Sequence, residues 1–296
     1  MTKKLIYEGV ATALAPPFKN GEVDYTALKR MIEFQIAGHV SAIVICGTTG
    51  ESPSLTDEET QKLIYTSAKI IDGRIKLIVG TGSLVFSRAM SQSKFASEHG
   101  ADGLLVITPF YNKGTENGIA EYYIRIANSC NTPIIIYNVP PRTGVDITLN
   151  TIEKIYGEEN IVGIKEASGK IDKSLDISTF FPDLNIYSGN DTMTLPILSL
   201  GGKGVISVLS NVLPEHCSDI CKYYFKKDLN SALDAQRKVT RLTHLLFGDV
   251  NPAPIKAALS MCGLCKNELR LPLSTVSSDL YNKILIELQK FGKTVT

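Results

Sequence analysis

The stretch PIIIYNVPPRTG, residues 133–144, joins an apolar run to a tyrosine, two prolines and an arginine. The run is short and rich in isoleucine, which is typical of a strand buried on both faces. Similar runs recur along the chain, and a segment of helical period follows each of them. The eight runs are GVATALAP, SAIVICG, IKLIVGTG, DGLLVITPF, PIIIYNVP, IVGIKEAS, NIYSGND and KGVISV. Strands that alternate with helices predict a parallel sheet, and eight continuous apolar strands favour a closed barrel.

The predicted fold is therefore of the α/β class, a (β/α)8 TIM barrel with a C-terminal helical appendix. One barrel helix shows clear end signals, because Thr56 and Glu59 form a predicted capping box and Gly73 is placed to end the helix. From about residue 214 to about residue 290 only helical signals follow. We expect residues 1–213 to form the barrel and residues 214–296 to pack on it, because no flexible linker separates them.

The charges of the chain are balanced, with 31 lysines and arginines against 30 aspartates and glutamates. Such a chain has no global field that would draw it to nucleic acid or to an anionic membrane, so a small molecule is the expected partner. The apolar stretch at the N-terminus is too short for a signal peptide, and no run is long enough to cross a bilayer. We expect a cytoplasmic protein.

Six cysteines, at positions 46, 130, 217, 221, 262 and 265, raise the question of a metal site. In a cytosolic chain they are expected to be reduced thiols. The spacings in HCSDIC and MCGLC could supply zinc ligands. Cys217 and Cys221 also stand one helical turn apart among apolar neighbours, where cysteine packs as a small hydrophobic residue. We favour packing, and we expect neither a metal nor a cofactor, since no histidine lies at a strand end.

The reactive side chains of a parallel barrel come from the carboxyl ends of its strands. Those positions carry GTTGES (47–52), TPFYN (108–112), YNVPPRTG (137–144), Lys165 and SGND (188–191). Lys165 is unexpected, because a strand with two apolar faces should exclude an ammonium group. One interpretation is an amine that burial keeps partly neutral, able to attack a carbonyl carbon and form a Schiff base. The other is an ion pair with Glu166 or another acid at the barrel rim.

The other strand ends offer the groups that Schiff-base chemistry needs, and each has a structural alternative. Tyr137 could relay protons or cap the core. Thr48 and Thr49 could hold a carboxylate or form a tight turn between glycines. Arg142 could grip a second carboxylate or remain a solvated surface charge. The run GGKG (201–204) precedes the last strand and so lies at the opposite end of the barrel, which favours a turn over a phosphate site.

In order and spacing, GTTGES, TPFYN, YNVPPRTG, GIKEASG, SGND and GVISV resemble the dihydrodipicolinate synthase family of pyruvate-dependent class I aldolases. The resemblance extends from ATALAPPF to NPAPIK (251–256) in the helical appendix. It implies a Schiff base between Lys165 and pyruvate, with L-aspartate 4-semialdehyde as the second substrate. It further implies that Tyr137, Thr48 and Tyr111 form a proton relay and that Thr49 holds the carboxylate of pyruvate. The backbone at Gly189 and Ile206 would line the pocket, and Arg142 would bind the carboxylate of the semialdehyde.

The same resemblance implies a pathway and an assembly. The reaction would belong to diaminopimelate and lysine biosynthesis, with no cofactor beyond the covalent pyruvate imine. The tyrosine that matches Tyr111 reaches into a neighbouring subunit in this family, so a homo-oligomer is implied, with a dimer of dimers expected. N-acetylneuraminate lyase and 2-keto-3-deoxy-sugar-acid aldolases share the lysine and the tyrosine and remain alternatives, although they lack the PxRTG loop. A catalytically silent pyruvate-binding barrel is a third alternative.

Regulation is a point at which the sequence departs from part of this family. Members inhibited by lysine bind it between subunits through polar and acidic groups. Leu84, Arg88 and Phe110 occupy the matching positions of this chain. An arginine in place of a glutamate would repel the ammonium group of lysine, so we expect weak or absent feedback inhibition.

Overall fold

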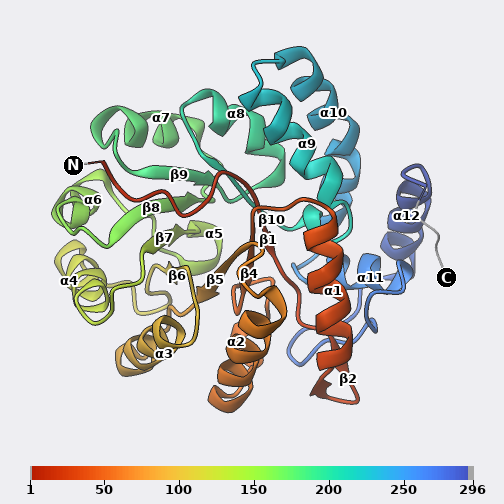
Figure 1. The fold of residues 1–296 in the computed structure, drawn as a ribbon, viewed down its shortest axis with the longest axis horizontal. Coiled ribbons are helices and arrows are strands. Elements are labelled where there is room, and N and C mark those ends of the chain that lie inside the picture. The colour runs from red at the N-terminus through yellow and green to blue at the C-terminus, as the bar shows by residue number, and fades with distance from the viewer. Residues whose placement is uncertain (1, 293–296) are drawn as a thin grey trace.

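A closed barrel of eight parallel strands forms the centre of the molecule in the computed structural model, which describes residues 2–292. Figure 1 shows the barrel with helices around it. Around the barrel the strands follow the order β1-β10-β9-β8-β7-β6-β5-β4. They are β1 (Gly9–Ala13), β4 (Ala42–Ile45), β5 (Lys76–Gly80), β6 (Gly103–Ile107), β7 (Ile134–Asn138), β8 (Ile161–Glu166), β9 (Asn185–Ser188) and β10 (Gly204–Ser207). Each predicted apolar run supplies one of these strands, so the predicted barrel is confirmed.

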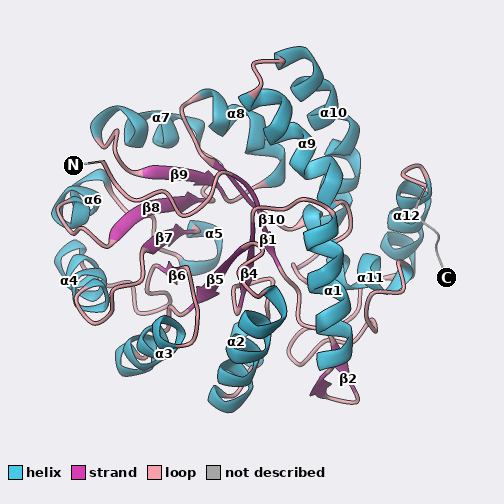
Figure 2. Cartoon of the chain, in the orientation of Figure 1, coloured by secondary structure: helices cyan, strands magenta, loops and turns pink. Residues whose placement is uncertain are grey.

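Helices alternate with the strands, and the longer ones cover the outside of the barrel (Figure 2). They are α1 (Tyr25–Ala37), α2 (Asp57–Ile71), α3 (Phe86–Glu98), α4 (Glu116–Ala127), α5 (Pro140–Thr143), α6 (Leu149–Tyr156), α7 (Ile171–Phe180) and α8 (Thr194–Ser199). Three 3₁₀ helices, η1 (Ser52–Ser54), η2 (Asp191–Met193) and η3 (Leu209–Asn211), follow strands β4, β9 and β10. The short helices thus lie at the carboxyl ends of strands, where a site is expected.

Two local details differ from the prediction. A small antiparallel hairpin of β2 (Phe18–Lys19) and β3 (Glu22–Val23) follows β1 and was not predicted. Its signal in the sequence is the Asn20-Gly21 pair, whose positive φ angles of 55° and 82° suit a tight hairpin turn. The capping box of Thr56 and Glu59 is present at the start of α2, but Asp72 already adopts the left-handed conformation one residue before Gly73.

The core consists of two layers, because successive side chains of a strand point to opposite faces. One layer fills the barrel interior and includes Tyr137, Val139 and Ile206, while the other packs between the strands and the helices. The barrel closes where β1 pairs with β10, with Gly9 opposite Gly204. A Cβ atom on Gly204 would lie 1.8 Å from the Gly9 carbonyl oxygen, so only glycine allows this approach.

A C-terminal helical region follows β10 and consists of α9 (Pro214–Phe225), α10 (Leu229–Leu246), α11 (Ala253–Met261) and α12 (Ser278–Gln289). Helix α9 buries Cys217 and Cys221 in the core, and Ser207 at the end of β10 donates a hydrogen bond to the Cys217 sulfur (3.9 Å). Burial raises the pKa of the Cys221 thiol to about 12, so it stays protonated. The division of the chain at residue 213 stays a prediction. No helix within residues 2–292 has both the length and the apolar character needed to cross a membrane.

Candidate active site

Lys165 and Tyr137 meet in the barrel interior on neighbouring strands. They are register partners of β8 and β7, near the carboxyl ends of both strands. The Lys165 Nζ atom lies 4.2 Å from the centre of the Tyr137 ring, and the lysine is only 6 % exposed. A cation over a desolvated aromatic ring is attracted to it, and the contact brings amine and phenol into one small space. The amine is therefore held against a group that can carry protons.

The structure argues against an ion pair between Lys165 and Glu166. Glu166 is the next residue of β8, so its side chain points away from the barrel interior. Its carboxylate accepts hydrogen bonds from Asn138 Nδ2 (2.9 Å) and from the Ser168 backbone N–H (2.6 Å). Lys165 is thus a buried lysine without Glu166 as its counter-ion.

Asp191 is a second buried acid at this end of the barrel. Its carboxylate accepts hydrogen bonds from the backbone N–H groups of Val208 (3.0 Å) and Leu209 (3.1 Å), at the start of η3. Burial raises the pKa of Asp191, against the opposing effects of these hydrogen bonds, of Ser207 and of the nearby Lys165 charge. Asp191 thereby joins the loop after β9 to the end of β10. The sequence analysis included it within SGND without giving it a role.

The turn after β4 carries Thr48 and Thr49 in different environments. Thr49 is buried, and its hydroxyl oxygen accepts a hydrogen bond from Asn251 Nδ2 at 3.0 Å. A hydroxyl that accepts a hydrogen bond can still donate its own proton, so Thr49 keeps a donor for an anionic ligand. Thr48 is partly exposed and lines an open cavity. The turn thus leaves Thr48 at the cavity and Thr49 against Asn251.

Arg142 stands on α5, a single helical turn that contains both prolines of the PPRTG stretch. Pro140 occupies the first helical position, which proline tolerates because that N–H has no helical partner. The Arg142 guanidinium is exposed and donates one hydrogen bond, from Nη2 to the Asn251 carbonyl oxygen at 3.1 Å. The rest of its fork is left for a carboxylate.

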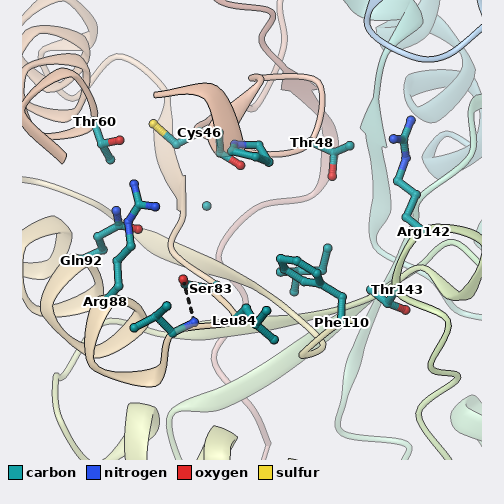
Figure 3. A pocket seen from close by; sticks show the side chains of 16 residues that line it. Cys46, Thr48, Thr60, Ser83, Leu84, Arg88, Gln92, Phe110, Arg142 and Thr143 are labelled. Carbon is teal, nitrogen blue, oxygen red and sulfur yellow. Dashed lines mark hydrogen bonds between the residues drawn. The ribbon is translucent and has the colours of Figure 1, made fainter. Parts of the chain in front are cut away.

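A cavity of about 390 Å³ opens beside these residues. Its lining includes Thr48, Ile107, Phe110 and Arg142 from the ends of β4, β6 and β7, and Leu84 and Arg88 from the segment after β5. Figure 3 shows Arg88, Gln92 and Thr60 on one side of the cavity, Arg142 and Thr143 on the opposite side, and Thr48 between them. Lys165 and Tyr137 do not line the cavity, although the lining residue Ile107 is the register partner of Tyr137 on the neighbouring strand.

Tyr111 is not brought to the other predicted site residues within the chain. Its side chain is 84 % exposed, and its backbone has a φ of 65°. A bulky residue in the left-handed region is uncommon and carries backbone strain. The chain thus holds an aromatic side chain outward at the rim of the barrel, next to the helix that carries Arg142, since Tyr111 N–H bonds to the Thr143 carbonyl oxygen (3.3 Å).

Gly189 and Ile206, whose backbone was predicted to line the pocket, lie directly after β9 and within β10, respectively. The N–H of Gly189 donates to the Glu166 carbonyl oxygen (2.7 Å). A Cβ atom at Gly189 would lie 2.4 Å from the Ala167 Cβ, so a side chain there would push into the segment after Lys165. Ile206 is buried in the barrel interior together with Tyr137. Their place in the structure is compatible with a pocket wall.

One residue at the site was missed. Asn251, 7 % exposed, contacts both Thr49 and Arg142 from the start of the C-terminal segment NPAPIK. Its Oδ1 atom is buried and has no hydrogen-bond partner among the residues that the structure describes. The motif was part of the resemblance, but nothing local in the sequence predicts which loops Asn251 reaches. Among the described residues, no three His, Cys, Asp or Glu side chains are arranged to hold a metal ion.

Comparisons with known proteins give a consistent result. The model of the dihydrodipicolinate synthetase family matches residues 6–290. A 4-hydroxy-tetrahydrodipicolinate synthase from Alkaliphilus oremlandii is 41 % identical over 286 residues, which cover 96 % of this chain and 99 % of the relative. The crystal structure of dihydrodipicolinate synthase from Aquifex aeolicus superposes with a TM-score of 0.96 at 41 % identity, covering 98 % of this chain and all of the other. A synthase from Cyanidioschyzon merolae with lysine bound has a TM-score of 0.94 at 33 % identity and covers 98 % and 99 % of the two chains.

Proposed function

Because the chain belongs to the dihydrodipicolinate synthetase family, we propose that it condenses pyruvate with L-aspartate 4-semialdehyde as a 4-hydroxy-tetrahydrodipicolinate synthase. The activity is that of a Schiff-base lyase of diaminopimelate and lysine biosynthesis. The observation that carries the proposal is the buried Lys165 amine held against the Tyr137 ring inside the barrel. A buried lysine beside a proton carrier is the arrangement that imine formation requires.

In the proposed reaction the neutral Lys165 amine adds to the C2 carbonyl of pyruvate. The C2–N bond forms, the carbonyl oxygen takes up a proton, and the carbinolamine then loses water to leave a C2=N imine. Tyr137 carries protons to and from these oxygen and nitrogen atoms, with Thr48 and Tyr111 completing the relay. Pyruvate is thus bound covalently, and no separate cofactor takes part.

The two carboxylates of the substrates have separate partners in this proposal. Thr49 holds the carboxylate of pyruvate with the hydroxyl proton that Asn251 leaves available. Arg142 faces the open cavity and binds the carboxylate of the semialdehyde with the part of its fork that Asn251 does not use. Gly189 and Ile206 form the wall beside the imine. A hydroxyl and a guanidinium are both suited to anions, so these assignments agree with the charge of the substrates.

We also propose that the enzyme works in the cytoplasm as a homotetramer, built as a dimer of dimers. Tyr111 supports this assembly, because its side chain is exposed on the surface of its own chain while Lys165 is buried. In a dimer, the Tyr111 side chain of each subunit would enter the site of the other and complete its proton relay.

The test is intact mass after incubation with pyruvate and borohydride, followed by turnover of the semialdehyde. We expect a pyruvate-sized adduct on the wild type and none on Lys165→Ala. Lys76→Ala is the matched control, because Lys76 also lies on a barrel strand but is exposed and paired with Asp102. It should keep the adduct.

Three outcomes distinguish the candidate functions. An adduct with ring product from the semialdehyde supports the synthase. An adduct without that turnover would favour an aldolase acting on sugar acids or N-acetylneuraminate, which the comparisons do not favour. The absence of an adduct would leave a catalytically silent barrel and would overturn the role of Lys165.

A further inference from the structure

A polar cluster lies directly behind Tyr137 and Lys165, on the outer face of the same two strands. Asn138 follows Tyr137, Glu166 follows Lys165, and Asn138 and Glu166 are themselves register partners. Because side chains alternate along a strand, Tyr137 and Lys165 point into the barrel while Asn138 and Glu166 point toward the helices. Asn138 and Glu166 are also the last residues of β7 and β8. Beyond them one further backbone hydrogen bond, from the Ala167 N–H to the Asn138 carbonyl oxygen (2.9 Å), joins the two segments.

The side-chain amide of Asn138 uses all its hydrogen-bonding groups inside the cluster. Its Nδ2 donates to Glu166 Oε2 (2.9 Å) and to Asp146 Oδ1 (3.0 Å), and its Oδ1 accepts from the Ile147 N–H (3.1 Å). Asn138 is fully buried and Glu166 almost so. A buried network that is fully satisfied specifies one geometry, because every alternative leaves a polar group unpaired.

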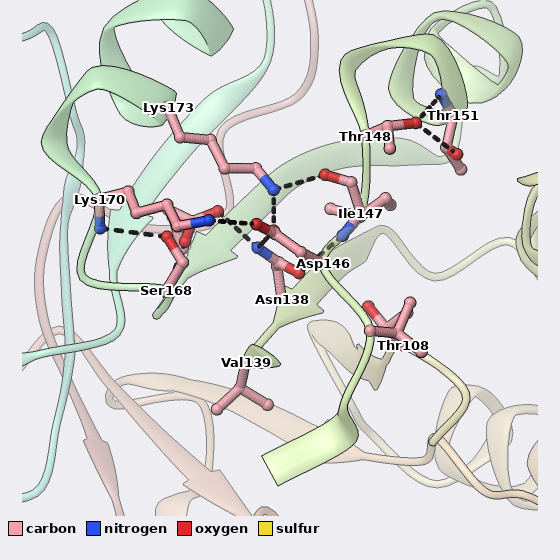
Figure 4. Close-up of polar contacts among 12 residues, drawn as sticks. Thr108, Asn138, Val139, Asp146, Ile147, Thr148, Thr151, Ser168, Lys170 and Lys173 are labelled. Atoms are coloured by element: carbon pink, nitrogen blue, oxygen red, sulfur yellow. Dashed lines mark hydrogen bonds and ion pairs between the residues drawn. The ribbon is translucent and has the colours of Figure 1, made fainter. Parts of the chain in front are cut away.

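Two lysines balance the charge of the cluster. Figure 4 shows Lys170 and Lys173 converging on Asp146 next to Asn138. Lys170 pairs with Asp146 at 3.1 Å, and Lys173 pairs with Asp146 and also donates to the Ile147 carbonyl oxygen. Burial acts to raise the pKa of Asp146, but the hydrogen bonds from Lys173, Asn138 and Lys170 outweigh it and lower the pKa. The cluster therefore joins the ends of β7 and β8, the loop after α5 and the start of α7.

We propose that Asn138 and Glu166 are positioning residues, which hold the ends of β7 and β8 so that Tyr137 and Lys165 keep the alignment needed for imine formation. This inference rests on the proposed roles of Lys165 and Tyr137. Neither Asn138 nor Glu166 touches the substrate. Loss of their side-chain hydrogen bond would loosen the alignment of the two strand ends, and a misplacement of about 1 Å costs up to about a hundredfold in rate.

The experiment measures how fast each variant forms the borohydride-trapped pyruvate adduct at saturating pyruvate, well below its unfolding temperature. We expect Asn138→Ala and Glu166→Ala to slow adduct formation and kcat by about ten- to a hundredfold, with smaller changes in the KM for pyruvate. Glu166→Gln keeps the size of the side chain and one acceptor, so it should recover part of the rate. If the alanine variants fail to fold, Glu166→Gln alone tests the proposal. A rate of adduct formation below that of the wild type supports the positioning role, and a rate equal to that of the wild type overturns it.

Asn160→Ala is the matched control for a purely structural effect. Asn160 immediately precedes β8 at its other end, and its amide holds the carbonyl oxygens of Ala127 and Cys130. Its loss should lower the unfolding temperature without slowing adduct formation. Wild-type rates in folded Asn138→Ala and Glu166→Gln would overturn the positioning role. An adduct on the wild type together with turnover of the semialdehyde would show that the proposed function still stands. The absence of an adduct on the wild type would overturn both the proposed function and the positioning role.

Discussion

Asn251 is the residue through which the C-terminal helical region touches the site. Its side chain orients the hydroxyl of Thr49 and its carbonyl oxygen holds Arg142, so one residue contacts the proposed partners of both substrate carboxylates. Because Asn251 Nδ2 donates to Thr49, the Thr49 proton is directed away from Asn251. The Thr49 hydroxyl can therefore donate to a carboxylate while Asn251 acts as the donor to Thr49.

Substitution of the Asn251 side chain should mainly affect pyruvate, because Arg142 donates to the backbone carbonyl oxygen of Asn251, which every residue keeps. We expect Asn251→Ala to lower kcat/KM for pyruvate by about fivefold to tenfold, the cost of roughly one lost hydrogen bond, and to change kcat/KM for the semialdehyde less. Asn251→Asp should raise the KM for pyruvate further, since an aspartate accepts the Thr49 proton and adds a negative charge beside the carboxylate. Steady-state kinetics with each substrate varied in turn measure both effects.

Asn267→Ala is the control for these variants. Asn267 also has a buried Oδ1 atom without a hydrogen-bond partner among residues 2–292, but it makes no hydrogen bond to Thr49 or Arg142. It should keep both KM values. Unchanged KM values in Asn251→Asp would show that Thr49 does not depend on Asn251.

At the scale of elements, a buried ion pair attaches the turn after β4 to α11. The side chains of Lys256 and Glu51 are both fully buried, with 2.7 Å between Lys256 Nζ and Glu51 Oε1. Lys256 also donates to the Glu268 carbonyl oxygen and lies 4.0 Å from the centre of the Phe18 ring in β2. Glu51 adopts a left-handed conformation and follows Thr49 by two residues. The pair thus fixes the GTTGES turn from the C-terminal side.

Removal of one partner of the Lys256–Glu51 pair should lower the free energy of unfolding far more than removal of both partners. Lys256→Met leaves the Glu51 carboxylate buried and unpaired, and we expect a loss of about 3–5 kcal/mol, seen as a clear fall in the unfolding temperature. The double variant Glu51→Gln, Lys256→Met should recover part of the lost stability. Thermal unfolding of the three proteins measures the difference.

The exposed pair of Lys283 and Asp279 on α12 provides the control. Lys283→Met should change stability by at most about 1 kcal/mol, because exposed ion pairs contribute little. An unfolding temperature for Lys256→Met equal to that of the wild type would mean that the buried pair does not hold the turn.

At the scale of the whole molecule, the cavity beside Arg142 bears on regulation. Leu84, Phe110 and Arg88 all line it. Arg88 places a cation there, held by Asp57 at 2.8 Å. A lysine ligand would bring a second cation and would meet an apolar side chain at Leu84. We therefore keep the prediction that lysine inhibits weakly or not at all.

Initial rates with increasing L-lysine test this prediction. The wild type should keep its activity at submillimolar lysine. Leu84→Asn combined with Arg88→Glu should make it more sensitive, because an acid and an amide replace the cation and the leucine. Arg125→Glu, an exposed change on α4, should have no such effect. Inhibition of the wild type by submillimolar lysine would contradict the prediction.

The barrel, and the placement of Lys165 and Tyr137 at neighbouring strand ends, could be predicted because their signals are local in the sequence. Each apolar run marks one strand, and Lys165 and Tyr137 stand at strand ends. The contacts of Asn251 with Thr49 and of Lys256 with Glu51 could not be predicted, because each joins residues more than 200 positions apart. The outward direction of Tyr111 and the helical turn of α5 depend on backbone conformation that composition does not encode. The catalytic roles themselves stay predictions.

Closure of the barrel between β1 and β10 also has a consequence for protein synthesis. β1 is the first barrel strand to leave the ribosome, and its partner β10 is the last. At ~5–20 residues per second, roughly ten to forty seconds separate Gly9 from Gly204. During that time the growing sheet has two unpaired edges, which can pair with neighbouring nascent chains. A translational pause before Gly204 therefore prolongs the exposure to misassembly, whereas a pause after β10 has emerged does not.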